Sequence, residues 1–163
     1  MTIVQVMTAS CGSHVTGVGY APEGQVQQQG TELAAGPLRE ETIVMLSGGS
    51  LADDAELRQG AGGEWKIHGD PTEAAFLVAE RKLGITERRE QRFLRSGEIP
   101  FTAERKMMST IEIDHEHGDE VVVITKGAPD VLLERCNRVR VGMDLVDLDD
   151  AWRARILADV DTL

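Results

Sequence analysis

Aromatic residues are scarce in this chain, whose 163 residues include three Phe, two Trp and one Tyr. The hydrophobic content of 41% is nevertheless ordinary for a globular protein, so the core is expected to be mainly aliphatic. A chain of this length can bury a substantial core as a single domain.

Long hydrophobic runs and an excess of basic side chains are also missing. The longest apolar run, residues 74–79 (AAFLVA), is far shorter than the ~20 residues of a membrane-spanning helix. The net charge of −11 argues against general binding to nucleic acids or anionic membranes, which draws on a basic excess. The N-terminus has no basic segment before a long apolar one, so no signal peptide is expected.

Cysteine is rare, and no metal-binding pattern is visible. Cys11 and Cys136 are far apart in the sequence, which predicts two reduced thiols in the core of a cytosolic protein. The four His have no zinc-ligand spacing, and His115 and His117 are expected to be solvated in a polar turn. We therefore expect no metal site.

The common catalytic and phosphate-binding motifs are absent as well. The sequence contains no G-x-x-x-x-G-K-[ST], no G-x-G-x-x-G after a strand and no H-E-x-x-H. No Ser/His/Asp or Cys/His arrangement is suggested by the local sequence. If the chain binds a nucleotide, it does so without a common phosphate-binding loop, and we assign no catalytic residue.

Hydrophobic periodicity and turn signals predict alternating helices and hairpins. Strands are expected at residues 2–8, 13–20, 64–68, 92–99, 106–114 and 119–126, with a further small hairpin at 137–146. Helices are expected at residues 37–49, 70–84, 86–91, 129–135 and 149–159, with a loop at 25–36 and a short helix plus loop at 51–63. Because most strands form hairpins, we predict an α+β fold with an antiparallel sheet of about six to seven strands flanked by helices.

Local signals predict where two of the helices begin and end. Asp70 is a plausible N-cap, Pro71 occupies the first helical position, and Glu73 has the spacing of a capping box. Gly84 is expected to end this helix, and residues 48–49 (GG) are expected to end the helix that starts at residue 37.

Three segments resemble one family. Residues 68–75 (HGDPTEAA), 99–109 (IPFTAERKMMS) and 125–130 (TKGAPD) are similar to the patterns G-[DE]-x-T-E-x-A, P-F-x-S-x-R-K-x-M-S and K-G-A-[PS]-E. Those patterns are typical of the nucleotide-binding domain of P-type (E1-E2) cation-transporting ATPases, especially the calcium and sodium/potassium pump group. Residues 16–24 and 131–136 resemble further parts of bacterial members. The order and spacing of the segments carry the resemblance, which covers nearly the whole chain.

The resemblance implies that residues 1–163 form one nucleotide-binding domain, a fragment of a larger membrane pump. Such a domain lies at the cytoplasmic face of the membrane and binds ATP or ADP, with Mg²⁺ accompanying ATP in the intact pump. Its partners are the phosphorylation and actuator domains. The phosphorylated aspartate of the family lies in a D-K-T-G-T motif that this sequence lacks, so the chain is expected to bind nucleotide without hydrolysing it.

The resemblance also implies roles for individual residues. Phe101 would stack on the adenine, and Lys126 would line the adenine pocket beside the small residues Gly127 and Ala128. On pattern alone, Phe101 reads as a core residue and Lys126 as a solvated surface lysine. Calcium pumps of this family often carry an Arg where this chain has Ala103, so one phosphate contact is expected to be missing or to be supplied by another residue.

Two further candidates have competing structural readings. Glu73 would accept a hydrogen bond from the adenine amino group, but a capping box would use the same carboxylate. Lys106 would project towards the ligand, and strand alternation would send Arg105 to the opposite face. Arg105 is therefore expected to be structural, paired with an acidic side chain.

Two other classes of function remain open from the residues alone. One is a stand-alone regulatory or interaction module that binds adenine nucleotides. The other is a small hydrolase, supported only by the abundance of carboxylates.

Overall fold

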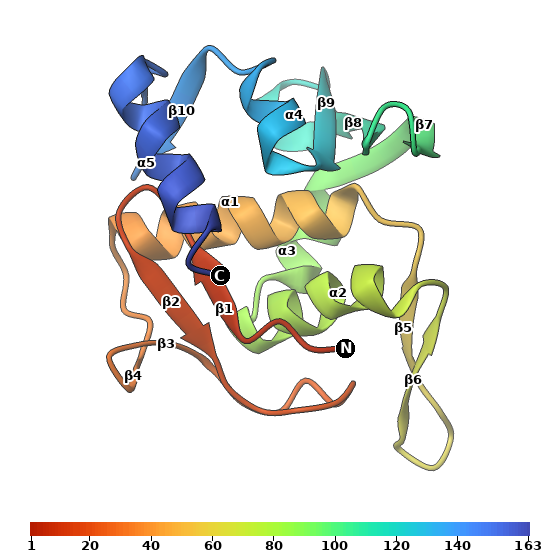
Figure 1. Ribbon diagram of the computed structural model, residues 1–163. Coiled ribbons are helices and arrows are strands. Elements are labelled where there is room, and N and C mark those ends of the chain that lie inside the picture. The colour runs from red at the N-terminus through yellow and green to blue at the C-terminus, as the bar shows by residue number, and fades with distance from the viewer.

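The computed structural model describes residues 1–163 and contains five α-helices and eleven short strands (Figure 1). The helices are α1 (Pro37–Leu51), α2 (Pro71–Leu83), α3 (Thr86–Arg92), α4 (Pro129–Leu133) and α5 (Asp150–Val160). The strands are β1 (Gln5–Met7), β2 (Gly12–Val15), β3 (Val26–Gln28), β4 (Thr31–Glu32), β5 (Glu56–Gln59), β6 (Trp65–His68), β7 (Phe93–Thr102), β8 (Met107–Asp114), β9 (Glu120–Gly127), β10 (Arg138–Val141) and β11 (Asp144–Asp147).

The α+β class is confirmed, and every strand pair is antiparallel. The strands do not form one continuous sheet, however. They are divided among the sheets β1-β2-β3-β4, β5-β6, β7-β8-β9 and β10-β11. Helix α1 crosses the middle of the molecule, with β7–β9 on one side and β1, β2 and α2 on the other (Figure 1). Because α1 lies between them, the strands on its two sides do not pair directly.

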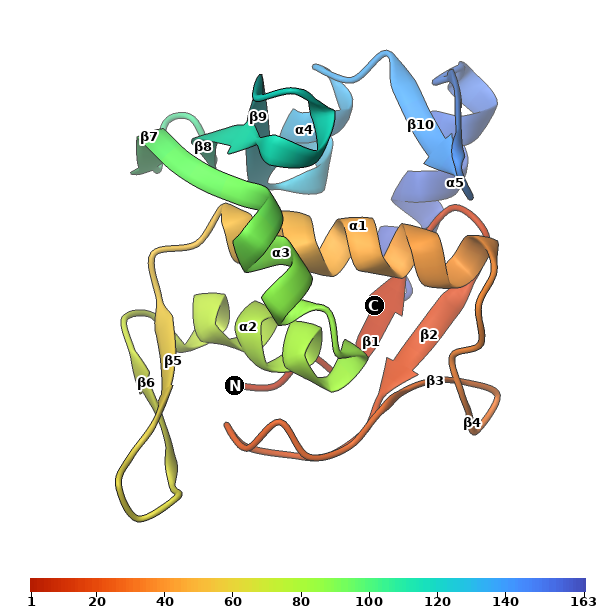
Figure 2. The same ribbon diagram turned by 180° about the vertical axis from the view of Figure 1, so that it is seen from behind.

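Two segments expected to be irregular contain strands. Residues 25–36 include the tight hairpin of β3 and β4, which reverses at Gln29 and Gly30, both with positive φ. Residues 51–63 contain β5 rather than a short helix, and β5 pairs with β6 in a hairpin that projects from the body of the molecule (Figure 2). The strand expected at residues 13–20 ends at Val15, because Gly17 and Gly19 adopt positive φ.

The glycine pair in α1 does not end the helix, contrary to the prediction. The helix continues to Leu51. A Cβ atom on Gly49 would overlap the ring of Phe76 in α2, whereas one on Gly48 would meet only Ile124 at 3.8 Å. Gly49 thus allows α2 to pack closely on α1. The glycine is needed for this contact between helices and does not end the helix.

The signals at the other helix ends are confirmed. The Asp70 carboxylate accepts hydrogen bonds from the backbone N–H of Thr72 (2.6 Å) and of Glu73 (3.4 Å), as an N-cap does. Gly84 has the left-handed conformation (φ 77°) of a C-cap glycine. Asp149 caps α5 by accepting from the Trp152 N–H at 2.8 Å.

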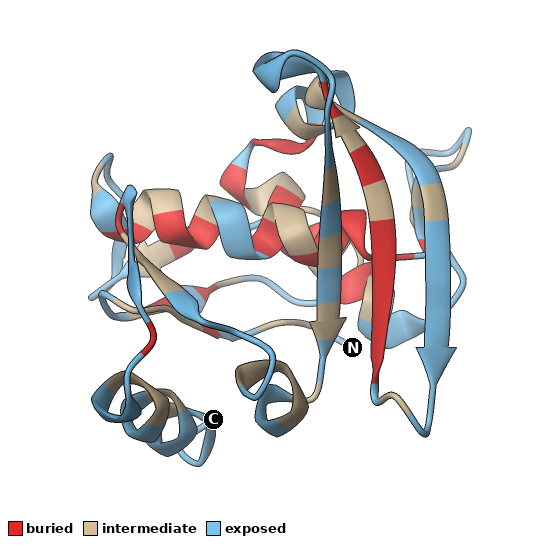
Figure 3. Cartoon of the chain, turned by 90° about the horizontal axis from the view of Figure 1, so that it is seen from above, coloured by how far each residue is buried: buried red, intermediate tan, exposed pale blue.

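The main core is aliphatic, as the composition predicted. Its buried side chains come from β1–β3, α1 and α2 and from the residues just after β4 and just before α3; they are Val6, Val15, Val26, Leu33, Leu38, Leu46, Ala79, Leu83 and Ile85. In the three-stranded sheet, the central strand β8 is largely buried while its neighbours are exposed (Figure 3). Cys11 and Cys136 are free, but both are exposed, so their expected burial in the core is wrong.

The longest helix, α1, has 15 residues, and none of the helices combines the length and apolar character needed to cross a membrane.

Candidate functional site

The residues predicted to bind nucleotide gather at one end of the three-stranded sheet. There β9 ends at Gly127, the chain turns through Ala128 into α4, and the β7–β8 turn lies alongside. The N-terminal turn of α2 brings Glu73 to the same place, because its carboxylate reaches Lys126 on β9.

The turn between β7 and β8 differs from the prediction. Residues 103–106 form a turn, and β8 begins only at Met107, so Arg105 and Lys106 do not alternate on a strand. Lys106 is exposed and has a positive φ of 54°. Arg105 is structural as expected, but its guanidinium donates to the Pro100 carbonyl (3.2 Å) and the Ser109 hydroxyl (3.4 Å) rather than to a carboxylate.

A close backbone approach joins this turn to the start of α4. The Ala128 N–H donates to the Lys106 carbonyl at 3.0 Å. A Cβ atom on Gly127 would overlap that carbonyl and the Met107 side chain, so only glycine fits at this position. Lys106, Gly127 and Ala128 are thereby brought together.

Phe101 lies at an irregularity of β7. Ile99 pairs with Ser109 and Thr102 pairs with Met107, so both Pro100 and Phe101 lie opposite Met108. Such a bulge redirects the side chains at the end of a strand. Met108 in turn pairs with Lys126, which places Phe101 and Lys126 in one transverse row of the sheet. The Phe101 side chain is 60% exposed and is not a core residue.

Lys126 is not a solvated surface lysine. Its Nζ atom is shielded from solvent and lies 3.2 Å from Glu73 Oε1 and 4.0 Å from Asp53 Oδ2. It also lies 5.3 Å from the centroid of the Phe76 ring, within the range of a cation–π contact. The ammonium is thus held between two carboxylates and an aromatic face.

The capping-box reading of Glu73 is wrong. Asp70 alone caps α2, while the Glu73 carboxylate points away from the cap towards Lys126. Its second oxygen accepts from the backbone N–H of Asp54 at 3.3 Å. Glu73 therefore ties α2 to β9 and to the segment that follows α1.

Sequence reasoning missed Asp53. Its side chain is 1% exposed, and Oδ1 accepts a hydrogen bond of 2.6 Å from the Ala55 N–H. Burial raises the pKa of Asp53 to about 6, partly opposed by the Ala55 N–H and by the nearby charge of Lys126. An acidic pair after a helix is common in loops, so the sequence carries no signal of this burial.

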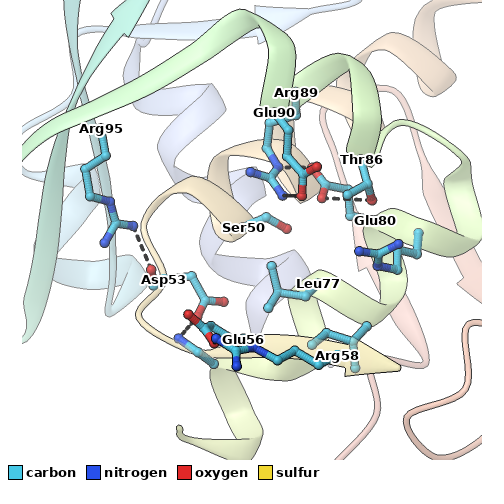
Figure 4. Close-up of a pocket in the computed structure, with 13 residues that line it drawn as sticks. Ser50, Asp53, Glu56, Arg58, Leu77, Glu80, Thr86, Arg89, Glu90 and Arg95 are labelled. Atoms are coloured by element: carbon cyan, nitrogen blue, oxygen red, sulfur yellow. Dashed lines mark hydrogen bonds and ion pairs between the residues drawn. The ribbon is translucent and has the colours of Figure 1, made fainter. Parts of the chain in front are cut away.

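Arg95 of β7 fixes the segment that holds Asp53. Its guanidinium donates to the backbone carbonyl of Asp53 (Figure 4). It also donates to the backbone carbonyl of Leu51 and to the Asp54 carboxylate at 2.9 Å. Its Nε atom also lies 3.5 Å from the buried Glu112 on β8. The corner between α1 and β5 is therefore anchored to the sheet.

Two cavities lie beside this region. One of 340 Å³ is polar and is lined in part by Ser50, Asp53 and Arg95 (Figure 4). The other, of 650 Å³, lies against α1, α3 and the sheet. Neither is lined by Phe101, Lys106, Lys126 or Glu73, so the residues predicted to bind nucleotide lie outside both cavities.

The arrangement suits binding rather than metal chemistry. It offers an exposed aromatic ring at Phe101, an exposed ammonium group at Lys106 and a buried ammonium group at Lys126 that is paired with Glu73. No group of three or more His, Cys, Asp or Glu side chains converges to hold a metal ion.

Comparison with known proteins assigns the family. Residues 41–163 match the family described as "P-type ATPase, cytoplasmic domain N". The chain is 35% identical over 143 residues to a calcium-transporting ATPase of Bacillus subtilis, an alignment covering 85% of this chain and 15% of that protein. It is 35% identical over 140 residues to the probable cation-transporting ATPase F of Mycobacterium tuberculosis, covering 83% and 15% of the two chains.

A more distant relative comes from a mammal. The calcium-transporting ATPase type 2C member 1 of Bos taurus is 28% identical over 138 residues, covering 83% of this chain and 14% of its own length. The chain thus spans only about 15% of the length of the bacterial relatives named above. On the extent of these matches, the chain belongs to the P-type cation-transporting ATPase family and corresponds to its cytoplasmic domain N.

Proposed function

We propose that this chain is the single ATP-binding domain of a cation-transporting pump and binds ATP or ADP at the end of the three-stranded sheet. The observation that carries the proposal is that Lys126, which lies in the same row of the sheet as the exposed Phe101, contacts Glu73 of α2 at 3.2 Å. The proximity of Lys126 and Glu73, which are far apart in the sequence, supports a shared binding site with Phe101.

Phe101 is proposed to hold the adenine by stacking. Its ring is exposed at a strand end, where it would otherwise leave apolar surface in contact with water. Stacking of a base on an aromatic side chain contributes ~1–3 kcal/mol. We therefore expect loss of the Phe101 ring to weaken nucleotide binding by a similar amount.

Lysine and backbone groups are proposed to complete the site. Lys106 is exposed on the adjoining turn, where its ammonium is free to approach phosphate oxygens. Glu73 is proposed to accept from the adenine amino group, and Lys126 to contact the base or the phosphates. Gly127 and Ala128 allow the ligand to approach the backbone closely.

The affinity is expected to be low. One stack of ~1–3 kcal/mol and one or two charge-assisted hydrogen bonds of ~1.5–3 kcal/mol each must offset an association cost of ~4–15 kcal/mol. No cluster of ligands suits Mg²⁺ on this chain. Mg²⁺ is therefore assigned to the intact pump, bound with ATP, and binding by this chain should depend little on it.

In the whole pump, the domain is proposed to deliver ATP to an aspartate on the phosphorylation domain, with the actuator domain as a further partner. Domain closure would then bring the γ-phosphoryl group in line with the acceptor. The parent is proposed to lie in a membrane with this domain on the cytoplasmic face. Because the acceptor motif is not in this sequence, the chain itself should release no phosphate from ATP.

The proposal is tested by titrating the ¹⁵N-labelled chain with ATP and following backbone amide shifts. Saturable shifts in the millimolar range are expected at Gly127, Ala128 and the β7–β8 turn, with similar shifts when adenosine replaces ATP. Equal titrations with and without Mg²⁺ are expected. Absence of any saturable shift at millimolar ATP would show that the proposed function is wrong.

A further inference from the structure

Asp53 places a second carboxylate beside the ammonium of Lys126. We propose that Asp53 is a positioning residue that competes with bound phosphate for this ammonium, so that protonation of Asp53 strengthens ATP binding. This inference rests on the proposed nucleotide site, and it adds a proton-dependent control to that site.

The geometry leaves one oxygen of Asp53 available for this competition. Oδ1 is occupied by the Ala55 N–H at 2.6 Å. Oδ2 is buried, has no hydrogen-bond partner and lies 4.0 Å from Lys126 Nζ. Burying an unpaired carboxylate oxygen is unfavourable, and the nearby ammonium of Lys126 offsets part of that free energy. Moving the ammonium away from Oδ2 is therefore unfavourable while Asp53 is ionised.

The local charge balance opposes an anionic ligand while Asp53 is ionised. Lys126 carries one positive charge, but Glu73 at 3.2 Å and Asp53 at 4.0 Å each carry a negative charge. The three groups then sum to a net negative charge beside the place proposed for the nucleotide. Protonation of Asp53 makes the sum neutral and frees the ammonium to turn towards a phosphate oxygen.

The groups around Asp53 set the range in which this change occurs. Burial raises its pKa to about 6, and the nearby carboxylates of Glu73 on α2 and Asp54 act in the same direction. The positive charge of Lys126 on β9 lowers the pKa of Asp53. Arg95 donates to the backbone carbonyl of Asp53, while its guanidinium forms ion pairs with the carboxylates of Asp54 and of Glu112 on β8. Asp53 is thus expected to change between its protonated and ionised forms near pH 6.

The experiment compares ATP affinity between pH 5.5 and pH 8 for the full chain and for Asp53→Asn. The asparagine retains an oxygen for the Ala55 N–H but carries no charge. Glu56→Gln is the matched control, because it removes the same charge from an exposed side chain on the neighbouring strand β5, paired with Arg58. The phosphates of ATP also titrate in this range, and comparison of the variants at each pH cancels that contribution.

At pH 8, Asp53→Asn is expected to bind ATP about 3- to 10-fold more tightly than the wild type, whereas the two should converge at pH 5.5. Glu56→Gln should follow the wild type throughout. Adenosine, which has no phosphate, should bind the wild type and Asp53→Asn equally at every pH. That last comparison separates control of phosphate binding from a general change in structure.

Three results would overturn the inference. If wild type and Asp53→Asn bind ATP with parallel pH profiles, Asp53 does not compete for the ammonium, although the nucleotide site stands. If Asp53→Asn strengthens adenosine binding as much as ATP binding, its effect is merely structural. If no form of the chain binds ATP or adenosine at millimolar concentration, the nucleotide site fails and this control fails with it.

Discussion

Gly49 of α1 lies so close to the ring of Phe76 in α2 that no side chain fits between the two helices at this point. The same ring lies 5.3 Å from the ammonium of Lys126. The contact between α1 and α2 therefore helps to fix the position of Lys126. A single glycine in a helix connects the packing of the core to the position of a proposed binding residue.

Substitution of the two adjacent glycines in α1 should have opposite effects. Gly49→Ala should lower the free energy of unfolding by about 1–3 kcal/mol, because its Cβ overlaps the Phe76 ring and forces a rearrangement. Gly48→Ala, whose Cβ meets only Ile124 at 3.8 Å, should raise it by about 0.5–1 kcal/mol through helix propensity. Urea denaturation measures both, and equal effects of the two substitutions would contradict this packing.

Removal of the proposed stacking ring should weaken nucleotide binding. Phe101→Ala should raise the dissociation constant for ATP roughly 5- to 100-fold, which corresponds to the loss of ~1–3 kcal/mol. Leu94→Ala is the matched control, because Leu94 is a similarly exposed apolar residue on the same strand. Fluorescence or NMR titration reports the affinities. Unchanged binding by Phe101→Ala would remove the stacking role.

Asp114 should stabilise the fold near neutral pH, and this stabilisation should be lost on acidification. The Arg92 guanidinium, whose Nε donates to Asp114 Oδ1 at 2.8 Å, together with His117, holds the pKa of Asp114 well below its usual range. The folded state therefore binds this proton less tightly than the unfolded state. The stabilisation is complete above the unfolded pKa of ~3.9 and is lost as the pH falls below it.

Asp114→Asn should accordingly lower the free energy of unfolding at pH 7 by roughly 2–3 kcal/mol. The difference from wild type should shrink as the pH is lowered from about 5 towards 2. Denaturant titrations at several pH values measure it, with the exposed Asp144→Asn as a control. A difference that stays constant across this range would show that the Arg92 contact does not act through the charge of Asp114.

Asp53 should affect stability with the opposite sign. Its pKa is raised to about 6 in the folded state, so the folded state holds this proton more tightly than the unfolded state does. The contribution of Asp53 to stability should therefore fall as the pH rises from about 4 to about 6, by roughly 3 kcal/mol in total. Asp53→Asn should lack this fall and become relatively more stable than wild type above pH 6. Superimposable stability curves for the two proteins would be the contrary result.

Some of the hairpins and helix ends of this protein are predictable from short stretches of sequence. Asp70 and Gly84 bound α2 as expected, because a cap depends on the residue type and on backbone groups a few positions away. The antiparallel hairpin of β8 and β9 is likewise marked by its alternating strands and polar turn. The family resemblance also comes from short motifs, so it too could be seen before the fold was known.

By itself, the sequence determined the α+β class, most of the elements, the aliphatic core and the family. Only the tertiary structure decided that the Gly49 position is a packing contact, that β8 begins after Lys106, and that Asp53 shares the ammonium of Lys126 with Glu73. The reason is physical: burial, charge pairing and pKa depend on groups that are near in space but distant along the chain. The scarcity of aromatic residues drew attention to Phe101, and the fold placed its ring in the open.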